Sequence, residues 1–435
     1  MRVLATASLL LVSFAVQAQT HDLVGYWHNW NDGNAPYIQL DAIDPRYTVI
    51  EIAFAEPLPG TSHNMAFAPS GTDQSEFIGD VAELQAQGKK VLISIGGANA
   101  TVHLDSDTER DEFVSSMMGI INTYGFDGID IDLEGSSVSS SGGTIAAPID
   151  AALIRLIDAI EAIGDAFETQ WGMPMMLTMA PETAYVQGGM SAFGGIWGAY
   201  LPIIDALRDR IDILQVQLYN SGSMYGIDGG IYIQGTADFV VSQTEATLQG
   251  FSTGGGAFAP LPPEKIAIGL PACPNAAGGG YVSPAVLASA VDYLRGTGPQ
   301  PGSYARTSTY PALRGLMTWS INWDAVSTCA TTYEYADTFQ ELFDVGTNMY
   351  ALDPTPAMAI WPTLTSAGSI LNVGNDMAGG PIELIDMTGR SVAMLTPLAN
   401  RTVALPPMLN AGTYVLLQRS AIGTVRSSRI VIDMP

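Results

Sequence analysis

Gly125-Phe126-Asp127-Gly128-Ile129-Asp130-Ile131-Asp132-Leu133-Glu134-Gly135 is the stretch around which this chain of 435 residues is organised. From Ile129 onward, apolar and acidic residues alternate. Because successive side chains of a β-strand point to opposite faces, Asp130, Asp132 and Glu134 share one face. Neighbouring carboxylates on that face lie roughly 7 Å apart, so they repel one another unless they share protons or face solvent. Stability alone does not favour such an arrangement.

The acidic strand has three interpretations. A solvated edge strand shows the same alternation, but it is not expected to open with Phe126-Asp127-Gly128 after a helix-like segment and to end at a glycine. A divalent cation would accept carboxylate ligands, but no other part of the sequence clusters the remaining ligands. The third interpretation is a catalytic strand whose carboxyl groups point into a cleft and have pKa values pushed apart. We expect the third, without a metal or another cofactor.

The same run resembles the DxxDxDxE signature of family 18 glycoside hydrolases, the chitinases and their relatives. Asp127, Asp130, Asp132 and Glu134 occupy its four acidic positions. Four acids at fixed spacing inside an apolar strand form a far more specific motif than an isolated glycine pattern.

Eight short apolar segments bounded by Gly, Pro or Asn are typical of buried parallel strands. They span residues 23–27, 48–55, 90–95, 128–133, 174–180, 211–218, 265–270 and 315–319. Helical patterns cover residues 75–87, 108–124 and 149–170. Strand, helix, strand repeated over about 300 residues predicts an α/β fold, a (β/α)8 TIM barrel, with its active site at the C-terminal ends of the strands.

Further segments resemble the same family. Ser94-Ile95-Gly96-Gly97 resembles its SxGG motif, in which Ser94 is structural. Gln217-Leu218-Tyr219-Asn220 resembles the QxYN pattern of plant class III, hevamine-like, and some bacterial chitinases, and Asn220 departs from the MxYD pattern of other members. Trp319 resembles the tryptophan beneath the bound sugar. The expected substrate contacts are Tyr26, Trp27, Gly97, Met179, Gln217, Asn220 and Trp319. For Tyr26 and Trp27, ordinary core packing is the alternative.

The resemblance implies a retaining, substrate-assisted reaction. Asp132 and Glu134 leave the same strand face, so they approach a sugar from one side and the nucleophile must come from elsewhere. The resemblance implies that it is the substrate's own 2-acetamido oxygen, as in family 18. Glu134 would act as general acid and then as base. Asp132 would orient the acetamido N–H and stabilise the oxazolinium, Asp130 would share a proton with Asp132, and Tyr219 would hold the acetamido oxygen. Asp127 is three residues before Asp130, so it belongs to the opposite face of the strand, and we expect it to be structural.

The expected function is hydrolysis of internal β-1,4 bonds of chitin. Residues 271–314 are too few for the extra α+β domain that walls the groove of exo-acting members, which favours an endochitinase. One alternative is an endo-β-N-acetylglucosaminidase acting on N-glycans. Another is a non-catalytic chitin-binding lectin, although such relatives lose the final glutamate, which this chain keeps as Glu134.

The N-terminus and the composition indicate an exported protein. Residues 1–18 have the pattern of a secretory signal peptide, whose apolar run is too short to span a membrane. A net charge of −26 argues against nucleic acid or an anionic membrane as partner and is compatible with a neutral polysaccharide.

The chain has two cysteines, Cys273 and Cys329, which form no CxxC pair, so zinc is not expected. Both a disulfide between them and two unpaired buried thiols remain open. We expect a monomer.

The sequence predicts a catalytic domain over residues 19–350, a linker over 351–368 and a small all-β sandwich over 369–435. The tail resembles the C-terminal sorting domain of type IX secretion substrates through residues 382–390, 410–416 and 429–432, which implies a secretion machinery as partner. A carbohydrate-binding module is the alternative, but Tyr414 is the tail's one aromatic side chain, so a stacking platform is lacking.

Overall fold

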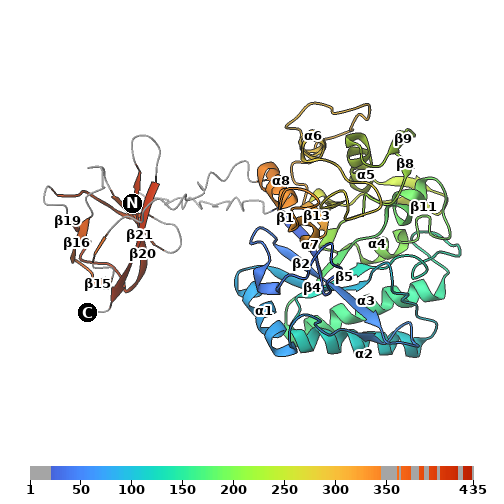
Figure 1. Cartoon of the computed structure of the whole chain (residues 1–435), viewed down its shortest axis with the longest axis horizontal. Helices are drawn as coiled ribbons and strands as arrows, with labels where there is room; N and C mark the ends of the chain where they lie inside the picture. Colours follow the sequence, from blue (N-terminus) through green and yellow to red (C-terminus); the bar gives the residue numbers. More distant parts are fainter. Residues whose placement is uncertain are drawn as a thin grey trace, which may run out of the picture. The chain divides into compact units, whose positions relative to one another are not determined.

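The computed structural model describes residues 21–343, 360–361, 364–373, 382–386, 391–398, 402–419 and 425–433. The predicted signal peptide lies outside the described residues, as does most of the predicted linker. The chain divides into two compact units, residues 1–345 and 346–435, and each is described by itself (Figure 1). Among the described helices, none is both long and apolar enough to cross a membrane.

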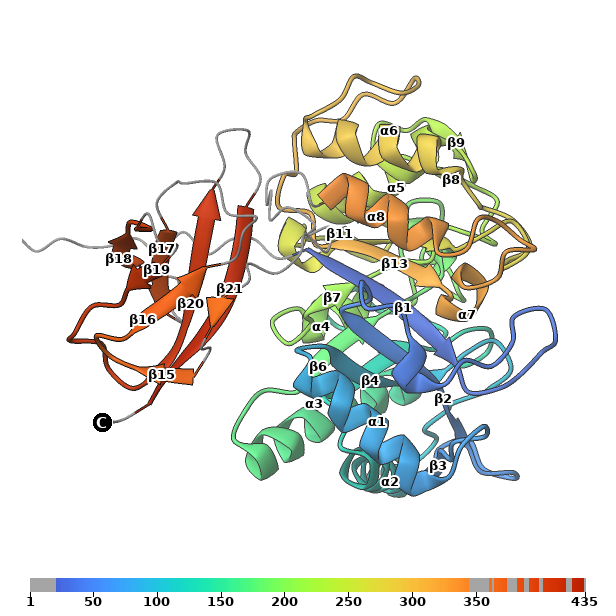
Figure 2. The ribbon, with the colours of Figure 1, turned by 60° about the vertical axis from the view of Figure 1, so that its left-hand side comes forward.

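Eight parallel strands form the centre of the first unit (Figure 2). They are β1 (Asp22–His28), β2 (Val49–Pro57), β4 (Lys90–Gly96), β5 (Gly128–Asp132), β6 (Met176–Met179), β7 (Ile213–Leu214), β12 (Ala267–Pro271) and β13 (Gly315–Trp319). The order is β12-β13-β1-β2-β4-β5-β6-β7. Parallel bridges from Leu214 to Ile266 and from Gln217 to Gly269 bring the two edge strands together, so the sheet closes nearly into a barrel. The predicted TIM barrel is thus confirmed.

Helices follow the strands and surround the barrel (Figure 1). They are α1 (Gln74–Ala86), α2 (Asp107–Tyr124), α3 (Ala151–Trp171), α4 (Leu201–Leu207), α5 (Ala237–Gln249), α6 (Pro284–Arg295), α7 (Ile321–Asp324) and α8 (Glu334–Phe343). Short 3-10 turns span Leu40–Ala42, Thr183–Tyr185, Gln187–Met190 and Pro263–Lys265. Small antiparallel pairs are β3 (Met65–Ala66) with β2, β8 (Ser223–Tyr225) with β9 (Ile231–Ile233), and β10 (Phe251–Thr253) with β11 (Gly256–Phe258).

The passage from α2 into β5 shows how local sequence places the acidic strand. The Ser106 side chain accepts a hydrogen bond from the backbone N–H of Glu109 and so caps the start of α2. The helix ends at Gly125, whose φ of 73° is a left-handed conformation that glycine adopts without strain. The chain therefore turns sharply, and β5 begins three residues later.

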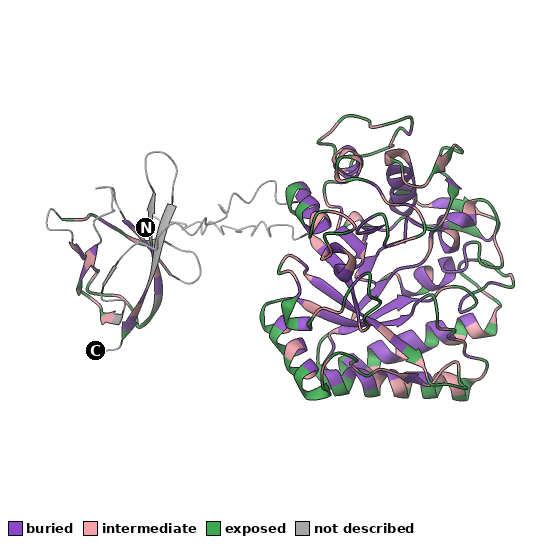
Figure 3. Ribbon diagram, viewed as in Figure 1, coloured by how far each residue is buried: buried purple, intermediate pink, exposed green. Residues whose placement is uncertain are grey.

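The two faces of the barrel strands have different environments. Ile129 and Ile131 of β5 point outward into the core that the strands share with the helices, and Figure 3 shows the buried strands inside helices whose outer sides are exposed. The inward side chains include Val24, Val49 and Ala53, which form a second, smaller core inside the barrel. The alternation in the sequence therefore separates an outward face of apolar side chains, buried against the helices, from an inward face that has the acidic side chains.

The described residues of the second unit form two sheets. One contains β14 (Ile360–Trp361), β16 (Ile370–Val373) and β19 (Thr402–Ala404), and the other contains β15 (Leu364–Ser366), β17 (Ile382–Asp386), β18 (Ser391–Leu395), β20 (Gly412–Arg419) and β21 (Val425–Asp433). Leu371 and Val403 of the first sheet share one apolar core with Leu416 and Ile430 of the second. This β-rich domain matches the predicted sandwich, although β14 and β15 lie within the range expected to be linker.

Candidate active site

Three carboxyl groups follow one another along β5 towards the C-terminal end of the barrel. Asp130 is completely buried, Asp132 is 2% exposed, and Glu134 stands just beyond the strand with a half-buried side chain. The period of two predicted this common face. The structure thus supplies acids at three depths, from the barrel interior to its mouth.

Asp130 is held by hydroxyl groups from three other strands. Tyr26 Oη of β1 and Ser94 Oγ of β4 both donate to Asp130 Oδ2 over 2.7 Å, and Thr178 Oγ1 of β6 lies 2.7 Å from Oδ1. Burial raises the pKa of Asp130, and the hydrogen bonds from Ser94, Tyr26 and Thr178 oppose this effect. Ser94 of β4 thus helps to hold Asp130 of the acidic strand in place.

Asp132 and Glu134 are coupled to each other and to Gln217. Gln217 Nε2 donates to Asp132 Oδ1 over 2.8 Å and to Glu134 Oε1 over 3.2 Å. Burial, and then the charges of Glu134 and Asp130, raise the pKa of Asp132 well above its usual range. Burial also raises the pKa of Glu134, while hydrogen bonds with Gln217 and Asp132 oppose the increase. In this structure the Asp132 carboxyl is therefore turned towards Glu134.

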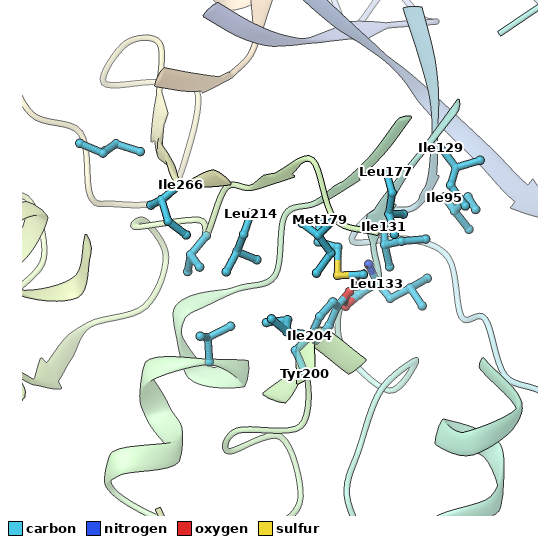
Figure 4. Close-up of a cluster of buried hydrophobic side chains, with 14 of the residues drawn as sticks. Ile95, Ile129, Ile131, Leu133, Leu177, Met179, Tyr200, Ile204, Leu214 and Ile266 are labelled. Carbon is cyan, nitrogen blue, oxygen red and sulfur yellow. Dashed lines mark hydrogen bonds between the residues drawn. The ribbon is translucent and has the colours of Figure 1, made fainter. Parts of the chain in front are cut away.

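Two tyrosines fix the backbone on either side of Glu134. The Tyr200 hydroxyl bonds both the N–H of Leu133, over 2.7 Å, and its carbonyl oxygen, over 2.9 Å. Figure 4 shows Tyr200 beside Leu133 among the apolar side chains of this region. The Tyr185 hydroxyl donates to the carbonyl oxygen of Gly135 over 2.6 Å. Glu134 has left the strand ladder, and these contacts replace the ladder in holding its position.

A cleft at the mouth of the barrel brings six of the predicted residues together: Asp132, Glu134, Gln217, Tyr219, Asn220 and Trp319. It is lined by Trp30, Phe54, Ala98, Asn99, Asp132, Glu134, Gln217, Tyr219, Asn220, Ala276 and Trp319. An adjoining hollow is lined by Trp30, Phe54, Glu56, Gly96, Gly97, Ala98 and Asn99. Burial, followed by the charges of Asp132 and Glu134, raises the pKa of Tyr219 well above 10.0, so its hydroxyl keeps a proton to donate. Concave sites of this kind are where ligands bind.

Three aromatic side chains form one wall of this cleft, which we call the aromatic wall: Trp30, Phe54 and Trp319. Phe54 and Trp319 are stacked, with ring centroids 5.9 Å apart and planes inclined by 11°. The Trp30 ring lies 6.2 Å from Phe54 and stacks at 4.5 Å on His28, whose Nε2 is 2.7 Å from Ser320 Oγ. Burial lowers the pKa of His28 to about 4, so a neutral ring supports Trp30.

Three expected substrate contacts lie elsewhere. Trp27 and Met179 are fully buried on the outer side of the strands, where Trp27 Nε1 donates to the carbonyl oxygen of Ile38. Figure 4 shows Met179 within that helix-facing core. Tyr26 points into the barrel but is 1% exposed, and its hydroxyl is used by Asp130. These placements correct the expectation for all three, because none of them lies on the cleft surface.

Two further expectations concern residues outside the cleft. Asp127 lies at the opposite end of β5 and accepts hydrogen bonds from Lys90 Nζ, Gln85 Nε2 and the N–H of Val91, each over 2.9 Å. Asp127 therefore anchors the start of the strand, away from the cleft, and its purely structural role stays a prediction. Cys273 and Cys329 form a disulfide that closes a separation of 56 residues. Of the two possibilities left open by the sequence, the structure contains the disulfide.

Several contributors were absent from the sequence prediction. For Glu51 the missing signal is strand parity. Val49 and Ala53 of β2 point inward while Ile50 and Ile52 point outward, so Glu51 must point into the barrel. Trp30 and Phe54 carry no comparable signal, since their place on the aromatic wall depends on the fold. Among the described residues, no group of three or more His, Cys, Asp or Glu side chains is arranged to hold a metal ion.

Comparison with known proteins identifies relatives of the barrel. The model of glycosyl hydrolases family 18 matches residues 22–342. A chitinase of Paenibacillus xylanexedens is 50% identical over 310 residues, which cover 70% of this chain and 58% of that protein. Exochitinase 1 of Streptomyces olivaceoviridis is 41% identical over 344 residues, covering 74% of this chain and 56% of that protein. The chain thus spans little more than half the length of these relatives.

A solved structure shows the same likeness in three dimensions. A family 18 chitinase from Chromobacterium violaceum matches with a TM-score of 0.66 and 37% sequence identity, covering 74% of this chain and 83% of that chain.

Proposed function

The chain belongs to glycosyl hydrolase family 18, and from this premise we propose that it is a chitinase that cleaves internal β-1,4 bonds between N-acetylglucosamine units with retention of configuration. The observation that carries the proposal is the cleft in which Asp132, Glu134, Tyr219 and Trp319 meet at the C-terminal end of the barrel. Barrel enzymes place their chemistry at this end.

Glu134 is the proposed general acid. Its raised pKa, caused by burial, keeps a proton available to the glycosidic oxygen at higher pH than for a free glutamate. As the C–O bond breaks, Glu134 gives this proton to the leaving alcohol. The resulting carboxylate then accepts a proton from the water that attacks the intermediate, which restores the acid.

The nucleophile in this proposal belongs to the substrate. Gln217 bonds both Asp132 and Glu134, so the two carboxyl groups face the sugar together rather than from opposite sides. A hydrolase with a protein nucleophile needs carboxyl groups on both sides of the bond. The 2-acetamido oxygen therefore attacks the anomeric carbon, Asp132 orients the acetamido N–H, and the Tyr219 hydroxyl donates to the acetamido oxygen. Trp319 supports the sugar ring.

The proposal of internal cleavage is supported by the connection between β12 and β13. This connection is described throughout and contains α6 but no strand, so no additional β-containing domain raises the wall of the cleft here. The relative from Streptomyces olivaceoviridis is named an exochitinase, which makes product length the deciding observation.

We further propose that the protein is exported with residues 1–18 as its signal peptide and is sorted through its second unit. The support is the sequence pattern of residues 1–18 and the likeness of the tail to type IX sorting domains. Mass analysis of protein recovered from the medium of the producing cells tests both, since cleavage after residue 18 and retention or loss of the second unit give different masses.

Product analysis tests the proposed reaction. Purified protein is incubated with a chitin hexamer and, in parallel, with an N-glycosylated protein. Dimers, trimers and tetramers that appear early from the hexamer support internal cleavage of chitin. Early release of a single product size from the chain end would contradict it. Release of glycans from the glycoprotein with an untouched hexamer would instead indicate an N-glycan endoglycosidase.

Removal of Trp30 is expected to weaken binding of long substrates. Trp30 lines both the catalytic cleft and the adjoining hollow, so a sugar beyond the cleaved pair can stack on it. We expect Trp30→Ala to raise KM for the hexamer about tenfold, corresponding to about 1.4 kcal/mol, with a smaller change for the trimer. The control is Trp171→Ala, because Trp171 is a part-exposed tryptophan at the end of α3, before β6 begins. Equal effects on the trimer and the hexamer would show that Trp30 holds no distant sugar.

Asp127→Asn is expected to reduce stability without affecting the reaction. The asparagine loses the charge-assisted hydrogen bond from Lys90 and part of the acceptor capacity that Gln85 and Val91 use. We expect a loss of about 1–3 kcal/mol in the free energy of unfolding, measured by denaturant titration. Because Asp127 is at the far end of the strand, kcat below the unfolding transition should equal that of wild type. A large fall in kcat would overturn the structural assignment of Asp127.

A further inference from the structure

Beneath the catalytic carboxyl groups, Glu51 of β2 is a fourth buried carboxyl that the reaction described above does not use. It is fully buried inside the barrel. Its Oε1 lies 2.5 Å from Gln215 Nε2 and 2.8 Å from Thr178 Oγ1, whereas its Oε2 has no hydrogen-bond partner among the described residues. A buried carboxylate with one unsatisfied oxygen is costly, so the ionised form is poorly accommodated here.

The contacts of Thr178 limit how many protons this region holds. Thr178 Oγ1 is 2.8 Å from Glu51 Oε1 and 2.7 Å from Asp130 Oδ1. A hydroxyl group has one hydrogen, so it donates to one of these oxygens and must accept from the other. If both carboxyl groups were ionised, one of the two short contacts would contain no proton. One carboxyl of the pair is therefore protonated.

The remaining contacts indicate which carboxyl carries the proton. Asp130 Oδ2 accepts from both Tyr26 and Ser94, which stabilises a negative charge on Asp130. The other hydrogen bond to Glu51 Oε1 comes from the neutral amide of Gln215. The proton consequently lies on Glu51 Oε1, which donates to Thr178, and Thr178 donates to Asp130. The three side chains form a proton path that begins at the closed interior of the barrel.

We propose that Glu51 is a positioning residue that holds one proton as a neutral acid and passes it through Thr178 to Asp130 when Asp132 binds the acetamido group of the substrate. Glu51 Oε1 gives its proton to Thr178 Oγ1, and Thr178 gives its own proton to Asp130 Oδ1. Glu51 becomes a carboxylate, Asp130 becomes neutral and Thr178 is regenerated, so the total charge is unchanged. A neutral Asp130 no longer repels the negative charge that Asp132 carries beside the oxazolinium. This inference deepens the proposed function and rests on it.

The titratable groups that face Glu51 are acids. They are Tyr26 of β1, Asp130 and Asp132 of β5, and Tyr219 beyond β7. Burial, and next the charge of Asp130, raises the pKa of Glu51 well above its usual value. Because the unfolded chain releases this proton near pH 4.3 and the folded chain retains it, the stability gained from Glu51 is greatest at low pH and declines as pH rises. A neutral glutamine has no such dependence.

The first measurement is thermal unfolding of the full chain as a function of pH, which requires no activity. We expect the Tm of Glu51→Gln, relative to that of wild type, to increase steadily between about pH 4 and about pH 8. A difference in Tm that does not vary with pH would show that Glu51 is not a proton holder. This result stands even if the protein hydrolyses no chitin, so it separates failure of this inference from failure of the proposed function.

The second measurement is the pH profile of kcat/KM for the hexamer. In Glu51→Gln the negative charge stays on Asp130, which is nearer to Asp132 and Glu134. We therefore expect the basic limb of the kcat/KM profile to shift to higher pH by about half a unit. We also expect the maximal kcat/KM to fall about tenfold. Thr178→Val interrupts the same path. The double variant Glu51→Gln, Thr178→Val should therefore lose no more kcat/KM than either single variant. Glu245→Gln is the control, because Glu245 is equally buried but bonded to Tyr304 and Tyr310 away from the cleft. Additive losses, or a basic limb that stays in place, would overturn the proton path.

Discussion

Glu134→Gln is expected to lower kcat on the chitin hexamer by a factor of about 10²–10⁴, the contribution typical of a general acid. Glutamine preserves the shape of the side chain and its contact with Gln217, which at present bonds Glu134 Oε1 over 3.2 Å. It has no proton that can be transferred to the leaving oxygen. KM should change little, because the substrate makes its other contacts with the cleft as before.

The leaving group provides a sharper form of this experiment. In a 2,4-dinitrophenyl chitobioside, the dinitrophenolate leaves without needing a proton. The first step of Glu134→Gln on this substrate should therefore be nearly as fast as in wild type. Equal losses on the hexamer and on the activated substrate would refute Glu134 as the acid. They would indicate instead that the substitution disturbs the cleft, for example through the backbone contacts of Tyr185 and Tyr200.

The pH profile of the wild type should show the same group. Burial raises the pKa of Glu134, so its acid form persists above the range of an ordinary glutamate and is lost as pH rises through the raised pKa. We therefore expect the basic limb of kcat/KM to lie at higher pH than the pKa of an ordinary glutamate side chain.

The alternation of apolar and acidic residues was sufficient to predict the faces of β5, because a period of two is intrinsic to any strand. The same rule shows why Trp27 and Met179 were misplaced. Tyr26 and Trp27 are adjacent in one strand, so both could not point into the barrel, and Thr178 and Ala180 already take the inward positions on either side of Met179. A position near the C-terminal end of a strand predicts proximity to the cleft, but parity decides whether the side chain points into the barrel.

Other features required the assembled fold. Trp30 follows β1, and Phe54 belongs to β2, yet both meet Trp319 of β13 on the aromatic wall. A cysteine count allowed a disulfide, but only a Cα–Cα distance of 5.7 Å between Cys273 and Cys329 distinguishes it from two free thiols. Likewise, no local pattern predicts that Tyr185 and Tyr200 hold the backbone around Glu134. These contacts join segments far apart in the chain, whose approach is set by the closure of the barrel.

Asp132→Asn is expected to reduce kcat by a factor of about 10²–10³, as removal of a preorganised electrostatic partner does in other enzymes. The asparagine keeps the size of Asp132 and can still contact Gln217, but it carries no negative charge to stabilise the oxazolinium. Unlike the loss of the acid, this loss should be equally large on the hexamer and on the dinitrophenyl substrate, because both must form the same cation. Asp127→Asn makes the same chemical change in the same motif at the other end of β5, and it should retain full turnover. If Asp132→Asn cleaved the activated substrate at the wild-type rate, Asp132 would serve proton transfer to the leaving group, and another residue would have to stabilise the cation.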